Sequence, residues 1–205
     1  KQIMRYGENP HQLAAFYAEP DSENVSLANF EQHGGKPLSY NNYVDLDAAL
    51  RLARNLSSDD WIDTPHACVI VKHNNPCGAA LSKTQVGAWV DALASDSESA
   101  FGCIVAFNQT VTMDVVNEIG GHFLECIVAP NYEVGVIEKL NEKKNRRVLS
   151  FPEIGNRLPE LGVDLAAKKI SGGWMIQTEE APVIDWGKAE VVTTIKPTDD
   201  EIASM

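Results

Sequence analysis

Hydrophobic and polar positions alternate along the middle of the chain between short apolar runs and longer segments with helical spacing. Short β-branched runs of the kind found in buried strands occupy 67–71, 103–107 and 126–129, and 147–150 is a fourth strand candidate. Apolar residues with helical spacing mark the segments 45–56, 84–94, 114–124 and 133–144. Strand and helix therefore alternate, which predicts an α/β fold with a sheet covered by helices.

The same spacing predicts which helical positions face the sheet. The expected inward residues are Leu46, Ala49, Leu50 and Ala53 in the first helix, Val86, Val90 and Leu93 in the second, and Val115, Ile119 and Phe123 in the third. Asp45 and Asp47 would then form an acidic first turn, which the helix dipole favours.

Polar segments with Pro and Gly predict the connections. Pro76 and Gly78 indicate a loop over 72–78, directly after the first buried strand. Beyond Phe151 the pattern weakens, so we divide the chain into a domain over 1–150 and a loop-rich extension over 151–205. Within that extension, 168–177 is predicted to be a turn feeding a strand, and a capping box formed by Thr198 and Glu201 predicts the start of a helix.

Composition narrows the possible partners. The chain has 205 residues, 44% apolar and 22% charged, which is ordinary for a globular protein. Its 29 acidic and 17 basic residues leave a net charge of −12, so we expect neither nucleic acid nor an anionic membrane surface as partner. No apolar run approaches the ~20 residues of a membrane-spanning helix. The chain starts without Met, and its last predicted helix has barely one turn, so we expect a piece of a longer protein.

The four cysteines suggest a reduced, cytoplasmic protein without a metal site. They are far apart, with no C-x-x-C pair: Cys68, Cys77, Cys103 and Cys126. The segment from Pro76 to Ala80 resembles the P-C-x-x-C of zinc deaminases. It lacks the second cysteine, and no H-x-E lies upstream, so we expect that zinc site to be absent.

Candidate chemistry begins at Lys72-His73, where a buried strand ends. A neighbouring cation opposes protonation of His73 and leaves its imidazole able to accept a proton near neutral pH. The Lys72 ammonium could stabilise a developing oxyanion. Taken alone, the pair is better explained as a surface lysine followed by a loop-capping histidine, because isolated charged neighbours are common.

Three further polar clusters stand at the ends of predicted elements. Arg5 and Tyr6 lie in the segment 5–12, where the guanidinium could bind a phosphate and the ring could stack. Asn42 belongs to 39–43, just before a helix, where asparagines could simply cap. Gly102 ends the acidic segment 95–102 and would let backbone approach a ligand. An ordered turn and a plain helix-to-strand connection explain the first and last clusters as well.

These clusters, in this order, resemble the transformylase domain of the bifunctional AICAR transformylase/IMP cyclohydrolase family. The matching stretches cover nearly the whole chain: RYGENPHQ, LSYNNYVDLDAAL, VKHNNPCGAA, SDSESAFGCIVAFN, ECIVAPNYE, KKNRRVL and KISGGWMIQ. The resemblance implies a cytidine-deaminase-like three-layer α/β fold without the deaminase zinc, of which 1–150 would be the first subdomain. It also implies a cytosolic homodimer, with AICAR and a folate as partners.

In this family a formyl group moves from 10-formyltetrahydrofolate to the 5-amino group of phosphoribosylaminoimidazolecarboxamide (AICAR). The resemblance makes His73 the base and Lys72 the stabilising cation. It places Arg5, Tyr6, Asn42, Gly102 and Glu125 around the nucleotide, with no metal. Glu125 stands where some relatives have Asp, and Cys103 where many have a second Gly.

The family's domain also continues into a second, similar half, which supplies much of the folate pocket. We therefore expect this chain to be the first half of a transformylase domain and inactive alone. Two alternatives stay open: a nucleotide-binding module without catalysis, and one half of a split enzyme.

Overall fold

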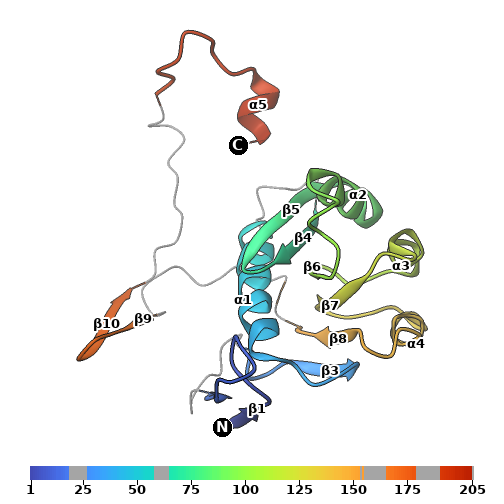
Figure 1. Ribbon diagram of the computed structural model, residues 1–205. Helices are drawn as coiled ribbons and strands as arrows, with labels where there is room; N and C mark the ends of the chain where they lie inside the picture. Colours follow the sequence, from blue (N-terminus) through green and yellow to red (C-terminus); the bar gives the residue numbers. More distant parts are fainter. Residues whose placement is uncertain (19–26, 58–64, 153, 155–164, 179–189, 205) are drawn as a thin grey trace. The chain divides into compact units, whose positions relative to one another are not determined.

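The computed structural model describes residues 1–18, 27–57, 65–152, 154, 165–178 and 190–204. The chain forms two compact units, Lys1–Leu158 and Pro159–Met205, and the first contains the main sheet (Figure 1). Among the described residues, no helix is long and apolar enough to cross a membrane.

The core of the first unit is a mixed sheet of six described strands. Their spatial order is β3 (Glu31–Gly34), β8 (Arg147–Ser150), β7 (Leu124–Ala129), β6 (Cys103–Phe107), β4 (His66–Lys72) and β5 (Asn75–Ser82). β6, β7 and β8 run parallel, whereas β3, β4 and β5 each pair antiparallel with their neighbours. The predicted α/β fold is confirmed, and the strands predicted over 103–107 and 147–150 have the predicted bounds.

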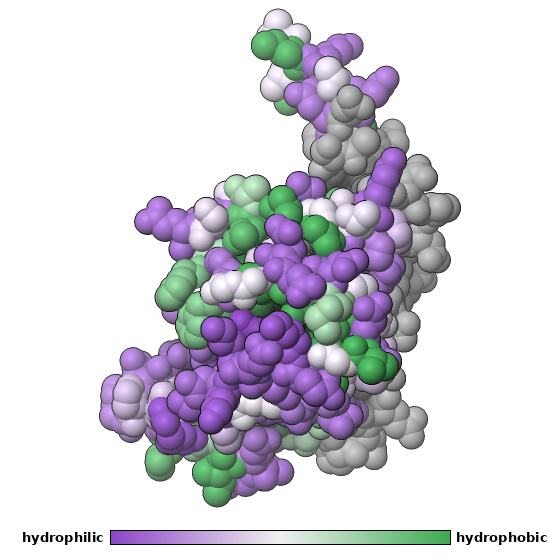
Figure 2. Space-filling model, turned by 90° about the vertical axis from the view of Figure 1, so that its right-hand side faces the viewer, coloured by the Kyte–Doolittle hydropathy of each residue, from purple (hydrophilic) through white to green (hydrophobic). Residues whose placement is uncertain are grey.

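Helices cover both faces of this sheet (Figure 1). On one face α1 (Tyr40–Asn55) packs its Leu46 and Ala49 against Val69 and Ile104. The other face carries α2 (Gln85–Ser95), α3 (Met113–Ile119) and α4 (Val136–Asn141). Alternate residues of each strand therefore enter two separate cores. The outer side of α2, α3 and α4 is mostly hydrophilic, with scattered apolar side chains (Figure 2).

Helix α1 begins five residues before its predicted start at Asp45. The backbone N–H of Asn42 donates to Ser39 Oγ (3.2 Å), and that of Ser39 donates to Asn42 Oδ1 (3.0 Å). This capping box satisfies helix-terminal donors that an apolar pattern does not reveal. The predicted acidic first turn is wrong, because Asp45 and Asp47 lie further into the helix.

The other helices are shorter or rotated relative to prediction. α3 ends at Ile119 and is followed by the cap residue Gly120, whose φ of 51° suits glycine, so Phe123 lies outside the helix and is 44% exposed. α4 covers only the middle of the predicted 133–144. In α2, Val90 is 43% exposed, and the buried side is formed by Gln85, Ala88, Trp89 and Ala92.

The predicted loop over 72–78 is wrong, because most of it is strand β5. β4 and β5 form a hairpin in which Lys72 pairs with Asn75, leaving His73 and Asn74 as a two-residue turn. Both turn residues have positive φ, 54° and 63°. Two-residue hairpin turns with both φ positive match the twist of the paired strands, and Asn is among the residues that tolerate this geometry best.

Two short strands at the N-terminus, β1 (Gln2–Met4) and β2 (Ala14–Phe16), were not predicted. They are fastened to α1 through Tyr43, whose hydroxyl donates to Gln2 Oε1 (3.1 Å) and whose ring stacks on Phe16 at 5.0 Å. The N-terminal segment therefore lies against the beginning of α1.

In the second unit, β9 (Leu165–Ile170) and β10 (Gly173–Thr178) form an antiparallel hairpin around the predicted turn. The predicted capping box is confirmed at α5 (Asp199–Ser204), because Thr198 N–H donates to Glu201 Oε2 and Glu201 N–H donates to Thr198 Oγ1. The backbone N–H and the hydroxyl of Thr198 both donate to the Glu201 carboxylate, and these two bonds lower the pKa of that carboxyl.

Candidate functional site

Most of the predicted site residues lie at one end of the central strands of the main sheet. Lys72 ends β4, Gly102 immediately precedes β6, and Glu125 is the second residue of β7. Because β4 is antiparallel to β6 while β6 and β7 are parallel, the carboxyl end of β4 meets the amino ends of β6 and β7. This end of the sheet therefore combines carboxyl and amino ends of strands, whereas the ligand-binding crevice of an all-parallel sheet is formed by carboxyl ends alone.

Lys72 and His73 are held by different contacts. Lys72 Nζ donates to the backbone oxygen of Phe101 (2.7 Å), which connects the end of β4 to the residue before Gly102. His73 is exposed at the tip of the hairpin, and its backbone oxygen accepts a bond from Asn75 Nδ2 (2.8 Å). The neighbouring N–H of Asn74 donates to Asp45 Oδ1 on α1 (2.6 Å). An exposed imidazole therefore stands on a tightly bonded turn.

A hollow of about 310 Å³ lies beside this pair. It is lined by Lys72, His73, Asn75, Pro76, Cys77, Asp96 and Ser99. Two clusters that are separate in the sequence, 72–78 and 95–102, thus share one concavity. Its lining combines a cation, an imidazole and a carboxylate, the groups that recognise and transform polar ligands.

Asp96 provides the carboxylate of the hollow, and hydrogen bonds from Ser99 hold it in place. Bonds from the side chain and the backbone N–H of Ser99 hold the pKa of the Asp96 carboxyl below its usual value. Burial raises the pKa of the Cys77 thiol, and the Asp96 carboxylate raises it further. At neutral pH the hollow therefore contains a charged Asp96 and a protonated Cys77.

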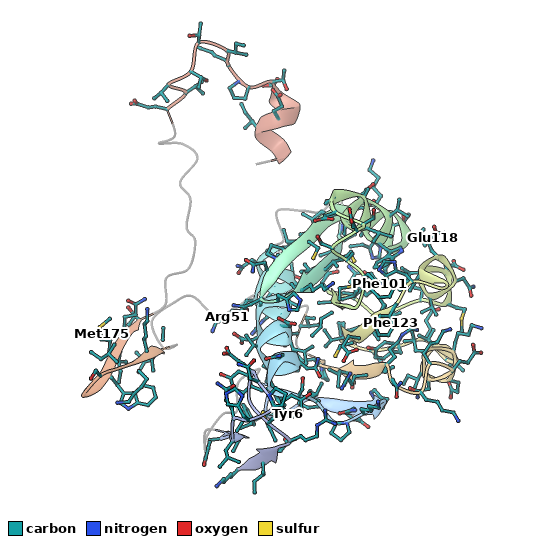
Figure 3. All side chains as sticks on the ribbon, in the orientation of Figure 1. Tyr6, Arg51, Phe101, Glu118, Phe123 and Met175 are labelled. Carbon is teal, nitrogen blue, oxygen red and sulfur yellow. The ribbon has the colours of Figure 1, made fainter. Side chains whose placement is uncertain are left out.

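Gly102 occupies a position that suits glycine. Its φ is 75°, and a Cβ there would lie 3.3 Å from the ring of Phe123. Its N–H donates to the Phe123 backbone oxygen (2.8 Å). The exposed rings of Phe101 and Phe123 lie together at the same place, with centroids 5.2 Å apart (Figure 3).

Glu125 forms an ion pair with Arg147, the first residue of β8. Arg147 is buried, and its Nη2 also donates to the backbone oxygen of Pro37 (3.3 Å). A buried guanidinium needs a counter-charge, because an unpaired charge inside a protein is costly. Glu125 is thus part of a structural ion pair at the edge of the site, with one carboxylate oxygen engaged by Arg147.

Asn42, Arg5 and Tyr6 are each already partnered. Asn42 is buried, and its Oδ1 completes the cap of α1. Arg5 Nη2 donates to Tyr6 Oη (2.9 Å), and the guanidinium lies over the Tyr6 ring at 4.7 Å. Figure 3 labels Tyr6 on this N-terminal segment, which Tyr43 joins to the beginning of α1.

Comparison with known proteins identifies the family of the chain that carries this site. The sequence model of the family described as "AICARFT/IMPCHase bienzyme" matches residues 1–205. The chain belongs to this family. It is 43% identical over 205 residues to the bifunctional purine biosynthesis protein PurH of Lacticaseibacillus casei strain BL23, and 41% identical over 208 residues to the PurH of Acaryochloris marina strain MBIC 11017. All of this chain is matched, but it spans only 38% and 37% of those relatives.

The resemblance predicted from the seven motifs is therefore confirmed. Within the part of the chain that the structure describes, no three or more His, Cys, Asp and Glu side chains group as metal ligands would.

The sequence pattern did not indicate a role at this site for three residues that the structure places there. Asp45 was interpreted only as part of a helix start, and Arg147 only as part of a strand. Phe123 was predicted to lie inside a helix. The KKNRRVL motif contains Arg147, so an arginine at the start of a predicted buried strand was the available signal that a carboxylate lies nearby. Asp45 gave no comparable signal, because its partner is a backbone amide 29 residues away.

Proposed function

We propose that this chain is part of an AICAR formyltransferase, which transfers the formyl group of 10-formyltetrahydrofolate to the 5-amino group of AICAR. The observation that carries the proposal is Lys72-His73 beside a polar hollow, in a chain whose whole length matches the family. The sheet with helices on both faces supports the cytidine-deaminase-like fold expected of the family. We assign the chain no metal, and the folate is its co-substrate.

The acceptor amine is a weak nucleophile, because its lone pair is delocalised into the imidazole carboxamide. Its nitrogen attacks the formyl carbon, and the carbonyl electron pair moves onto oxygen. His73 takes the proton that the amine loses. The oxyanion then re-forms the carbonyl, the bond from carbon to N10 of the folate breaks, and N10 receives the proton that His73 had taken. Formyl-AICAR and tetrahydrofolate are the products.

Lys72 stabilises the oxyanion in this scheme. A lysine ammonium has three donors, so Lys72 can keep its bond to the Phe101 oxygen while a second N–H points at the substrate. Its half-buried position strengthens that interaction relative to water. The Phe101 contact also limits the positions that the ammonium can take.

The nucleotide-binding roles fall to donors and acceptors that the contacts described above leave over. Arg5, for example, keeps guanidinium N–H groups besides the one that it donates to Tyr6. Arg5 binds the phosphate, and Tyr6 donates or stacks beside it. The Glu125 oxygen not engaged by Arg147 accepts from the ribose hydroxyls. Asn42 presents Nδ2, because its Oδ1 caps α1. Gly102 brings backbone close to the ligand.

The whole protein's properties are part of the same proposal. The chain belongs to a longer cytoplasmic protein that also carries IMP cyclohydrolase activity and acts as a homodimer. The missing part supplies most of the folate pocket, so the 205-residue chain alone is inactive. The short span relative to the PurH proteins supports this division.

Calorimetric titration of the chain with AICAR tests the nucleotide site. Arg5→Ala should abolish binding. Arg51→Ala is the matched control, because Arg51 is an exposed arginine whose side chain pairs with Asp47 on the outer side of α1. Binding that survives Arg5→Ala would contradict the phosphate assignment.

Formyl transfer by the longer protein tests the chemistry. His73→Asn is the sharper variant, because Asn tolerates positive φ and so removes the base without disturbing the turn. It should lower kcat by about 10²–10⁴-fold while AICAR binding persists. Lys83→Ala, at an exposed lysine, is the control for Lys72→Ala. Unchanged turnover in His73→Asn would contradict the assignment of His73 as the base. A longer protein that binds AICAR but shows no formyl transfer would favour the nucleotide-binding module without catalysis.

A further inference from the structure

One carboxylate outside the hollow's lining reaches the turn that carries His73. Asp45, on α1, accepts a bond from the backbone N–H of Asn74 at 2.6 Å. This contact joins the helix on one face of the sheet to the tip of the β4–β5 hairpin. The Asp45 carboxylate also adds to the effect of burial in raising the pKa of Cys77, which lies on β5 beside the hollow.

The turn that Asp45 supports is strained. His73 and Asn74 are the non-glycine residues with positive φ in the described part of the chain, and they are consecutive. Left-handed backbone is unfavourable for most non-glycine residues, so a turn with two of them in succession persists only where neighbouring contacts determine it. A bond from a backbone N–H to an ionised carboxylate is stronger than one between neutral groups.

Three anchors converge on this turn. Asn75 Nδ2 holds the His73 oxygen from the strand side, and Lys72 is held to Phe101. Asp45 provides the only side-chain bond from another element to the turn's own two backbone N–H groups within the described residues. It lies three positions after Asn42, so α1 carries both a proposed nucleotide contact and the support of the proposed base.

We propose that Asp45 is a positioning residue for His73, holding the left-handed turn so that the imidazole meets the acceptor amine. The proposal rests on the function proposed above. It assigns Asp45 no contact with substrate. Its effect should therefore fall on kcat rather than on the KM for AICAR.

The test compares Asp45→Ala, Asp45→Asn and the control Asp47→Asn. Asp47 lies two residues further along α1, and its contact among the described residues is an exposed pair with Arg51, so its variant removes the same charge without reaching the turn. In the longer protein, Asp45→Ala should lower kcat about 10–100-fold with KM for AICAR little changed, as a small misplacement of a catalytic group does. Asp45→Asn keeps an acceptor oxygen and should restore most of the loss. Asp47→Asn should match the wild type.

A measurement independent of turnover is made on the 205-residue chain by NMR. Asp45→Ala should reduce the hydrogen-exchange protection of the Asn74 amide about tenfold, with His73 ring signals shifted or broadened. Asp47→Asn should change neither. If Asp45→Ala does not fold, Asp45→Asn tests the positioning role instead, and we expect a smaller change in the Asn74 amide protection and in the His73 ring signals.

The outcomes separate this inference from the proposed function. A longer wild-type protein without formyl transfer contradicts the proposed function, and the NMR signals then decide whether Asp45 orders the His73 turn. Active protein with unchanged kcat in Asp45→Ala overturns the positioning role. A rise in KM without a fall in kcat also overturns it, since Asp45 would then act on binding.

Discussion

At the scale of single residues, the site depends on backbone geometry as much as on side-chain chemistry. Lys72-His73 was identified from residue type and position, but the sequence pattern predicted a loop there. The structure instead shows a two-residue turn in which His73 and Asn74 both have positive φ. The imidazole is presented by a conformation that few residue types tolerate.

Substitution of Asn74 should therefore affect stability according to φ rather than side-chain contacts. Asn74→Val should destabilise the chain by about 1–2 kcal/mol, because a β-branched residue is poorly tolerated at positive φ. Asn74→Gly should remain within about 0.5 kcal/mol of wild type, since glycine accepts this geometry and retains the N–H that bonds Asp45. Urea denaturation measures both. Equal losses in the two variants would contradict this account of the turn.

At the scale of elements, the approach of α2 to β5 decides how the site hairpin is supported. Gly78 on β5 lies so close to α2 that a Cβ would come within 1.9 Å of the Ala92 backbone oxygen. The hairpin bearing Lys72 and His73 thus packs closely against α2 through β5, and its turn is hydrogen-bonded to Asp45 of α1. A glycine within a strand commonly marks such an approach of another backbone.

Gly78→Ala should therefore destabilise the first unit by about 1–3 kcal/mol, because a backbone oxygen cannot move aside as a flexible side chain can. Gly121→Ala is the matched control, because a Cβ at Gly121 meets nothing within 4 Å and the φ of Gly121 lies outside the left-handed region. Thermal unfolding of the two variants measures the difference. Equal melting temperatures would show that α2 and β5 are not in this contact.

At the scale of the whole molecule, two cores on opposite faces of one sheet protect most of the thiols. Cys68, Cys103 and Cys126 are buried within these cores, whereas Cys77 is partly exposed at the hollow. Burial raises the pKa of Cys103 to about 12, against an ordinary value of 9.0. The buried thiols therefore report on global unfolding.

Labelling with a thiol reagent near pH 8 should modify Cys77 quickly and the three buried cysteines only as the chain unfolds. The pH dependence has a definite sign. Between about pH 9 and pH 12 the unfolded state loses the Cys103 proton while the folded state keeps it, so stability falls as pH rises through this window. Labelling of the three buried cysteines, the slow phase, should therefore become faster as the pH rises from about 9 to 12. Cys77→Ser should remove the fast phase only, and a fast phase that persisted would contradict the burial of the other three.

The sequence by itself determined the α/β class, the central strands, the family and the location of the proposed base. Strands over 103–107 and 147–150 were predicted with their observed bounds. Central strands flanked by neighbours are buried on both faces, and continuous apolar runs record this directly. Lys72-His73 stands at the end of such a run. Its position therefore followed from local pattern alone.

Only the tertiary structure decided what surrounds that pair. β5 contains Pro76 and Gly78 and lies at the edge of the sheet, so its sequence resembles a loop, and its strand character depends on pairing with β4. The bond from Asn74 to Asp45 and the pair between Glu125 and Arg147 each join residues more than 20 positions apart. Local patterns record burial and backbone preference, whereas such contacts depend on which elements the fold brings together.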